Sequence, residues 1–186
     1  MKVLLFGISN VGKTTVGKIL AKKLDYKFVD LDDVIKEKFN SIEEFQKNYP
    51  FQYEAHKIKG KLLKDLCKEN NSVIAVSPIY YSRNFNDLLK NVDVIAFELQ
   101  DSPKNIFERL IFTDEFDNVC EDSKEYKNKH KEYYLNDIKE DILYYKKAFI
   151  KIDNKYNVDG RNPEYVAEQI YKIISKNKIQ LPRNPR

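Results

Sequence analysis

Cysteine and histidine are scarce in this chain of 186 residues, which contains two of each. Cys67 and Cys120 stand apart without a C-x-x-C pair, and His56 and His130 have no partner at metal-ligand spacing. A disulfide framework or a structural zinc site would need such clusters. We therefore expect two reduced thiols, as in a cytoplasmic protein, and no structural metal.

Long hydrophobic runs are also missing from the sequence. No stretch approaches the roughly 18 apolar residues of a membrane-spanning helix. The first apolar run, residues 3–6, predicts a strand close to Met1, which leaves no room for a signal peptide. These features favour a cytoplasmic protein without a membrane partner.

Neither sign of charge dominates, and arginine is rare. The 33 basic and 29 acidic residues are mixed along the chain, with a net charge of +4. This pattern predicts a solvated surface instead of a basic stripe for nucleic acid. Only five basic residues are arginines, the side chain that most often grips anionic substrates through its planar fork. We expect a monomer that binds a small molecule and no nucleic acid.

A glycine-rich loop lies between the first apolar run and a helical pattern. Residues 7–14 spell G-x-x-x-x-G-K-T, and residues 16–24 place their apolar side chains on one helical face. Strand, loop and helix in this order predict a phosphate-binding loop for a nucleoside triphosphate. Glycines permit the tight turn and the close approach of backbone to phosphate. The expected nucleotide contacts are Gly7, Asn10, Val11, Gly12, Lys13, Thr14 and Thr15.

The chemistry expected of this loop involves an acidic cluster that follows the second predicted strand, residues 26–30. Ligands of parallel sheets bind beyond the carboxyl ends of strands. Lys13 is expected to contact the β- and γ-phosphates, and the Thr14 hydroxyl to coordinate Mg²⁺ with help from Asp30. Asp32 would accept a hydrogen bond from the attacking hydroxyl. Alternatively, Asp32 or Asp33 caps a helix over residues 34–39, and both roles are compatible.

Further apolar runs complete the predicted fold. Strands are expected at residues 73–76, 92–97 and 148–153, and helices near 53–68, 103–111, 134–145 and 163–175. The alternation predicts an α/β fold, a P-loop NTPase-type three-layer sandwich with a five-stranded parallel sheet. Residues 1–176 would form one domain, and residues 177–186 a disordered tail.

Residues 112–130 lack apolar periodicity and are rich in charge. A loop of this length is usually functional, so we expect a lid over the phosphates. Lys127, Lys129 and Lys131 either cover the phosphates or begin a solvated helix. Arg83, after the third strand, is either an anion contact or a surface residue at a helix start.

The string S-N-V-G-K also resembles the phosphate loop of translational GTPases, which need D-x-x-G and N-K-x-D segments as well. Here Asn157 replaces the final aspartate of N-K-x-D, and no D-x-x-G ends a second apolar strand. Four other motifs match a different family: G-x₄-G-K-T-T-V-G-K-x-L-A from residue 7, F-V-D-L-D-D-x-I from 28, S-I-E-E from 41 and R-N-P from 161. Over residues 2–176 the chain resembles shikimate kinase.

The resemblance implies a nucleoside-monophosphate-kinase type of fold, with a substrate-binding segment near residues 32–71 and the lid at 112–130. It places Lys13, Thr14, Asp30 and Asp32 at phosphate, magnesium and substrate-hydroxyl positions. It also places Arg109 and Arg161 beside the adenine.

The chain departs from the family's pattern where the substrate carboxylate binds. One family arginine aligns near Ala55, where His56 and Lys57 are the nearest basic residues, and another aligns near Glu140. The lid segment contains no arginine, and the Gly-Gly-Gly turn becomes residues 77–79, S-P-I.

The sequence therefore predicts an ATP- and Mg²⁺-dependent kinase that phosphorylates a hydroxyl group of a small metabolite. Asp32, Arg83 and Lys57 are its expected substrate contacts. Shikimate is the nearest candidate. Two alternatives remain. The acceptor is another polyol, a sugar or a nucleoside, or the chain is a nucleotide-binding protein without phosphotransfer.

Overall fold

The computed structural model describes residues 1–79, 83–112, 120 and 123–180, and the side chains of 83–85, 123 and 177–180 are not considered. Within this part, five parallel strands form one sheet with the order β2-β3-β1-β4-β5. The predicted five-stranded parallel sheet is confirmed. The strands are β1 (Lys2–Phe6), β2 (Lys27–Asp30), β3 (Ser72–Ala75), β4 (Val94–Gln100) and β5 (Asn154–Asn157).

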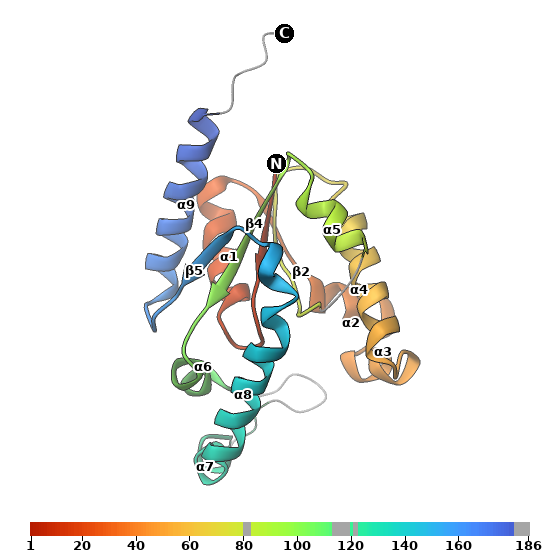
Figure 1. The fold of residues 1–186 in the computed structure, drawn as a ribbon, viewed down its shortest axis with the longest axis vertical. Coiled ribbons are helices and arrows are strands. Elements are labelled where there is room, and N and C mark those ends of the chain that lie inside the picture. The colour runs from red at the N-terminus through yellow and green to blue at the C-terminus, as the bar shows by residue number, and fades with distance from the viewer. Residues whose placement is uncertain (80–82, 113–119, 121–122, 181–186) are drawn as a thin grey trace.

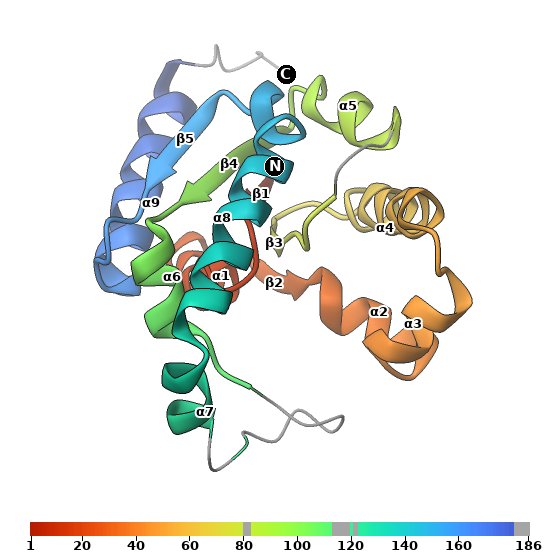
Figure 2. The same cartoon turned by 60° about the horizontal axis from the view of Figure 1, so that its bottom comes forward.

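Helices cover both faces of the sheet, giving the three layers predicted for this fold (Figure 1). One face carries α1 (Lys13–Leu24) and α9 (Pro163–Gln180). The other carries α4 (Gln52–Leu66), α5 (Arg83–Leu89) and α8 (Lys131–Lys146). Helices α2 (Leu31–Phe39) and α3 (Ile42–Asn48) extend away from the end of β2 and lie beside α4 (Figure 2). Two short helices, α6 (Pro103–Arg109) and α7 (Ser123–Lys129), lie beyond the carboxyl edge of the sheet (Figure 2).

The central strand β1 separates two hydrophobic clusters. Leu4 and Phe6 pack toward α4 and α5, whereas Val3 and Leu5 pack toward α1 and α9. All five residues of β1 are buried, as expected for an apolar strand in the middle of a doubly covered parallel sheet. This arrangement fixes the start of the glycine-rich loop directly after Phe6.

The fifth strand is not where the sequence predicts it. The apolar residues of 148–153 belong to a 3₁₀ turn, Phe149–Lys151, and its surroundings, and the strand follows at Asn154–Asn157. Phe149 and Ile152 are buried in the cluster that contains Phe6. The apolar pattern therefore reflects the burial of these side chains next to the end of α8. Strand β5 itself is polar, lies at the edge of the sheet and is held by its pairing with Phe97–Gln100.

Three smaller features complete the fold. Helix α9 continues to Gln180, so the first part of the predicted disordered tail is helical, and residues 181–186 lie outside the described residues. Cys67 is buried and Cys120 is exposed, and both are free thiols. Among the described helices, none combines the length and the apolar character that crossing a bilayer requires.

Candidate functional site

The candidate site lies at the carboxyl ends of three adjacent strands. Leu5 of β1 and Asp30 of β2 both pair with Ala75 of β3. The segments that follow β1 and β2 therefore leave the sheet at the same edge, one strand apart. This brings the glycine-rich loop beside the acidic cluster, as expected for ligand sites in parallel sheets.

Two glycines shape the loop for different reasons. Gly7 has φ +140°, and a Cβ there would lie 2.6 Å from the Leu99 carbonyl oxygen and 2.8 Å from Val11 Cγ1. Gly12 has φ +105° and precedes the first residue of α1, and a Cβ there would meet nothing within 4 Å. Gly7 is required by the packing of the loop, and Gly12 by its backbone conformation. The open space at Gly12 leaves the start of α1 accessible to a phosphate.

Lys13 folds back across the loop that precedes it. Its Nζ donates hydrogen bonds to the carbonyl oxygens of Gly7 (3.0 Å) and Ile8 (2.8 Å). Burial lowers the pKa of Lys13 to about 8, the charges of Asp32 and Asp30 oppose this change, and Lys59 adds to it. Lys13 is thus a cation with few water contacts, held where an anionic ligand of the loop would sit.

Asp30 connects the loop to helix α2. Its Oδ2 accepts a hydrogen bond from the Thr14 hydroxyl (2.6 Å), and its Oδ1 accepts one from the Asp32 backbone N–H (3.0 Å). Asp30 is therefore the N-cap of α2, and the prediction that Asp32 or Asp33 caps this helix is wrong. The helix begins three residues earlier than predicted because the strand ends directly in the capping residue. The half-buried carboxylate of Asp32 is left free of the cap.

The donors available to a metal ion are few but suitable for magnesium. Among the described residues, no cluster of three or more His, Cys, Asp or Glu side chains has a metal-binding arrangement. Thr14 and Asp30 instead offer one hydroxyl and one carboxylate, whose nearest oxygens are 2.6 Å apart. Mg²⁺ at nucleotide sites takes one or two such oxygens and completes its shell with phosphate oxygens and water. The residues present fit that ion.

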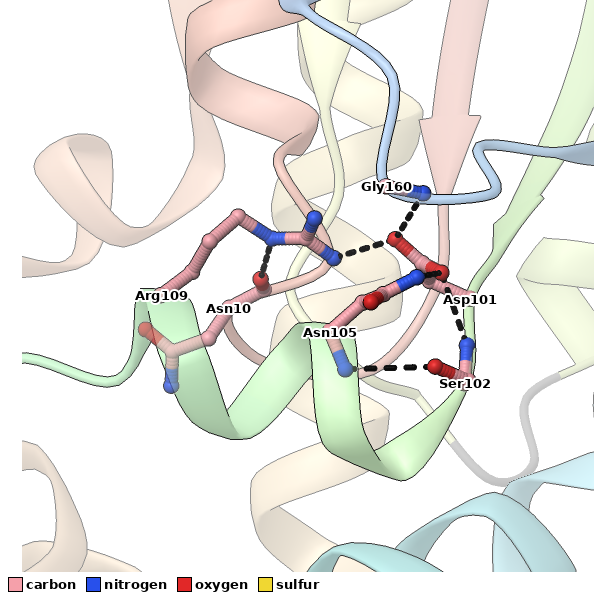
Figure 3. Close-up of polar contacts among 6 residues, drawn as sticks. All are labelled: Asn10, Asp101, Ser102, Asn105, Arg109 and Gly160. Carbon is pink, nitrogen blue, oxygen red and sulfur yellow. Dashed lines mark hydrogen bonds and ion pairs between the residues drawn. The ribbon is translucent and has the colours of Figure 1, made fainter.

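Arg109 lies against the outer side of the loop. Its Nε donates to the Asn10 carbonyl oxygen (3.1 Å), and its Nη2 pairs with Asp101 Oδ2 (2.6 Å). Figure 3 shows the Asp101 carboxylate between Arg109, Asn105, Ser102 and Gly160. This buried carboxylate fixes Arg109 on the loop.

Arg161, the second expected adenine neighbour, lies on the turn before α9. Its side chain stacks on the Tyr165 ring, 5.0 Å from the ring centroid, and pairs with Asp159 at 3.7 Å. The preceding residue, Gly160, donates its N–H to the Asp101 carboxylate that holds Arg109. Asp101 therefore joins the end of α6, which carries Arg109, to the turn before α9, which carries Arg161.

Comparison with known proteins identifies the family. The family model of shikimate kinase matches residues 9–175. The chain belongs to the shikimate kinase family. The shikimate kinase of Thermodesulfovibrio yellowstonii is 32% identical over 176 residues, covering 91% of this chain and 92% of the relative. That of Clostridium botulinum is 30% identical over 179 residues, with 95% and 98% coverage.

Solved structures agree on the fold. Shikimate kinase from Bacteroides thetaiotaomicron superimposes with a TM-score of 0.73 at 19% identity, covering 94% of this chain and 98% of that one. The enzyme from Acinetobacter baumannii, solved in complex with shikimate, gives 0.73 at 18% identity, covering 96% and 95%. The protein is thus an ATP-dependent small-molecule kinase of the shikimate kinase type, with a P-loop kinase fold.

Two lysines of α4 differ in how far they are withdrawn from solvent. Lys57, the predicted contact, is exposed on α4, whereas Lys59 on the same helix is half-buried with Nζ 6.0 Å from the Phe45 ring centroid. Lys59 lies four residues after Ala55 and four before Leu63, on the inward face. Helical periodicity alone could have indicated it.

His56 and Glu140, at or near the family's arginine positions, do not replace those arginines. His56 is buried and stacks on Tyr145 of α8, with ring centroids 6.5 Å apart, and burial lowers its pKa, with a further contribution from Lys59. Glu140 is exposed on α8. His56 thus serves the contact between α4 and α8.

The sequence leaves two roles open for Lys127, contact with the phosphates or a place at the start of a solvated helix, and the structure shows a third. This residue is neither beside the loop nor solvated: it is buried on α7 and donates to the carbonyl oxygens of Phe107, Glu108 and Leu110 at 3.1–3.3 Å. Lys127 therefore caps the end of α6. Lys129 and Lys131 are exposed. Arg83 begins α5, but its side chain lies outside the described residues, as do 113–119 and 121–122 of the predicted lid.

Proposed function

We propose that the protein transfers the γ-phosphate of ATP to a hydroxyl group of shikimate. The arrangement of Lys13, Asp30 with Thr14, and Asp32 at one edge of the sheet carries this proposal. These groups match the needs of phosphoryl transfer, which are positioning and neutralisation of charge. Similarity to shikimate kinases along more than nine tenths of the chain supports the choice of acceptor.

Each side chain has a distinct role in the proposed reaction. The Lys13 ammonium moves from the carbonyls of Gly7 and Ile8 to the β- and γ-phosphate oxygens and neutralises their charge. Asp32, half-buried at the first turn of α2, orients the acceptor hydroxyl through a hydrogen bond. A loose transition state demands mainly this orientation and little transfer of the proton to the carboxylate.

Mg²⁺ would be held by the Thr14 hydroxyl with help from Asp30. When bound, the ion would neutralise negative charge on the phosphate oxygens. The hydrogen bond that Asp30 accepts from the Asp32 N–H keeps the start of α2 in place beside these donors.

The remaining assignments describe how the chain surrounds its ligands. Arg109 and Arg161 border the adenine, residues 32–71 form the substrate-binding segment, and residues 112–130 form a lid within a single domain, 1–176. We further propose that the enzyme works as a monomer in the cytoplasm and binds neither nucleic acid nor membranes. The mixed charge of the chain and the polar residues of the edge strand β5 support this description.

ADP release by the purified protein with Mg·ATP tests the proposal. We expect shikimate to stimulate release strongly, and Lys13→Ala to abolish it because the phosphates lose their cation. Asp32→Asn should keep ATP binding and lower turnover by roughly 10²–10⁴-fold, the usual contribution of a positioned acid or base. ATP turnover that shikimate leaves unchanged would show that the acceptor is a different molecule.

A further inference from the structure

Lys59 is a half-buried cation on α4, the helix that contacts α2 and therefore the element that carries Asp32. It projects from the inward face of α4, and its Nζ lies 6.0 Å from the centroid of the Phe45 ring. It forms no ion pair or hydrogen bond with any residue in the described ranges. A lysine withdrawn from water usually has a partner for its charge. Lys59 is therefore prepared for an anion that comes from outside the chain.

Helix α4 contacts α2, and the charges around Lys59 couple it to the catalytic residues. Burial lowers its pKa and the carboxylate of Asp32 opposes this shift, while Lys59 in turn lowers the pKa of Lys13. Lys13 is attached to the carbonyls of the phosphate loop and Asp30 is occupied by Thr14 and the start of α2. Lys59 makes no hydrogen bond to the loop or to α2. Of the two lysines, it is therefore the one whose charge is available to the acceptor.

We propose that Lys59 binds a carboxylate of the acceptor and determines the preference of this kinase for hydroxy acids over neutral polyols. The inference rests on the proposed function, because the acceptor hydroxyl must lie at Asp32. The Phe45 ring shields the contact from water and so strengthens the attraction between the two charges.

A single ammonium group recognises a carboxylate differently from an arginine. Arginine fixes a carboxylate in one plane through two parallel hydrogen bonds, whereas lysine is a point charge on a flexible stem. Because Lys59 offers one ammonium group and no planar fork, the acceptor's carboxylate is held by charge more than by orientation. The enzyme should therefore tolerate acids whose carboxylate is turned relative to the reacting hydroxyl.

The same helix supplies a matched control. Lys61 lies two residues from Lys59 and is exposed, so its ammonium remains in solvent. Lys59→Met and Lys61→Met remove the same charge and keep a similar side-chain volume. Lys59→Arg restores a cation at the inward position. A difference between the two methionine variants therefore reports the location of the charge and not the net charge of the protein.

The experiment measures kcat and KM with shikimate and with its uncharged carboxamide. We expect the wild-type enzyme to prefer the acid, and Lys59→Met to raise KM for the acid on the order of 30-fold, as for loss of a charged hydrogen bond. KM for ATP and for the carboxamide should change less than about twofold. Lys59→Arg should retain the preference, and Lys61→Met should resemble the wild type. An unchanged acid preference in Lys59→Met would overturn the inference while leaving the kinase assignment intact.

Binding measurements keep the two proposals separable. If the wild type phosphorylates neither compound, the proposed function fails, and calorimetric titration of both compounds in the presence of ADP decides the inference. Selective binding of the acid that disappears in Lys59→Met supports it. Equal binding of acid and carboxamide, or no binding of either, refutes it. Thermal unfolding of each variant confirms that the fold is retained.

Discussion

At the scale of single residues, Lys13 is an ammonium group that folding makes easier to deprotonate. Its pKa falls from 10.5 to about 8 because burial outweighs the nearby carboxylates. A folded-state pKa below the unfolded value means that the unfolded chain binds more protons between about pH 8 and 10.5. The free energy of unfolding therefore rises with pH in that window as far as Lys13 is concerned.

The same pKa predicts that ATP binding takes up a proton. Bound phosphates stabilise the charged ammonium, so Lys13 should be half-neutral at about pH 8 in the free protein and protonated in the complex. Phosphate groups with a pKa near 6 are already ionised there. Calorimetry at pH 8.5 in buffers of different ionisation enthalpy should detect an uptake approaching one proton, which Lys13→Met abolishes. Equal heats in all buffers would contradict this reading of Lys13.

Asp101 is the second residue whose charge deserves a direct test. Burial alone would raise the pKa of its carboxyl, but hydrogen bonds from Asn105, Arg109 and Ser102 hold that pKa below its usual range. A lowered folded-state pKa stabilises the protein above the unfolded value of 3.8, and this stability is lost as the pH falls through the folded value.

Asp101→Asn should therefore lower the free energy of unfolding by about 3 kcal/mol at pH 7, because it leaves Arg109 without its buried partner. The variant should also lose less stability than the wild type when the pH is lowered below 4. Asp159→Asn is the control, since it breaks an exposed pair with Arg161 worth under about 1 kcal/mol. Urea unfolding at pH 7 and pH 3 measures both effects, and equal losses in the two variants would contradict the prediction.

At the scale of elements, the short helix α6 joins the phosphate loop to α7. Its last residue, Arg109, donates to Asn10 of the loop, and its terminal carbonyls accept from Lys127 of α7. The Lys127 ammonium also lies 5.1 Å from the Phe107 ring centroid. A cation is favourable at this end of a helix because of the helix dipole. The last turn of α6 thus contacts both the phosphate loop and α7.

Lys127→Met should loosen α7 with little effect on the sheet. The variant leaves the carbonyl oxygens of Phe107, Glu108 and Leu110 without this donor, which costs roughly 1.5–3 kcal/mol for a charged hydrogen-bonding group. Hydrogen exchange of the amides of residues 123–129 should become faster, whereas those of β1 stay protected. Lys129→Met, on the exposed side of α7, should exchange like the wild type. Equal exchange in both variants would show that Lys127 does not anchor α7.

Helices and strands were predictable from the sequence where their hydrophobic pattern matches their burial in the structure. The strand at residues 3–6 and the helix from Lys13 follow from a buried apolar run and a one-sided pattern. The fifth strand was missed because its own residues are polar and its position depends on pairing with β4. The apolar residues beside it, Phe149 and Ile152, satisfy the core without forming a strand. An edge strand of this kind carries little signal of its own.

At the scale of the whole molecule, the predictable part of the site is the part that is local in sequence. The order of Gly7, Gly12, Lys13 and Thr14 defines the loop, and the acidic cluster after β2 lies beside it because parallel strands end at one edge. The contacts of Lys59 and Asp101 join segments far apart in the chain. Helical periodicity places Lys59 on the inward face of α4, but its contact with Phe45 depends on the packing of α4 on α3. The contacts of Asp101 depend on the turn before α9, which no local pattern specifies.

The two thiols differ in burial, which allows one of them to be labelled selectively in the intact protein. Burial raises the pKa of Cys67 to about 11, so this thiol has almost no reactive thiolate near neutral pH. Cys120 is exposed. A maleimide dye should therefore attach at one position of the natural sequence, between α6 and α7, without mutagenesis. Changes in its fluorescence on addition of ATP or acceptor would follow ligand binding in real time, in the same sample that is used for turnover.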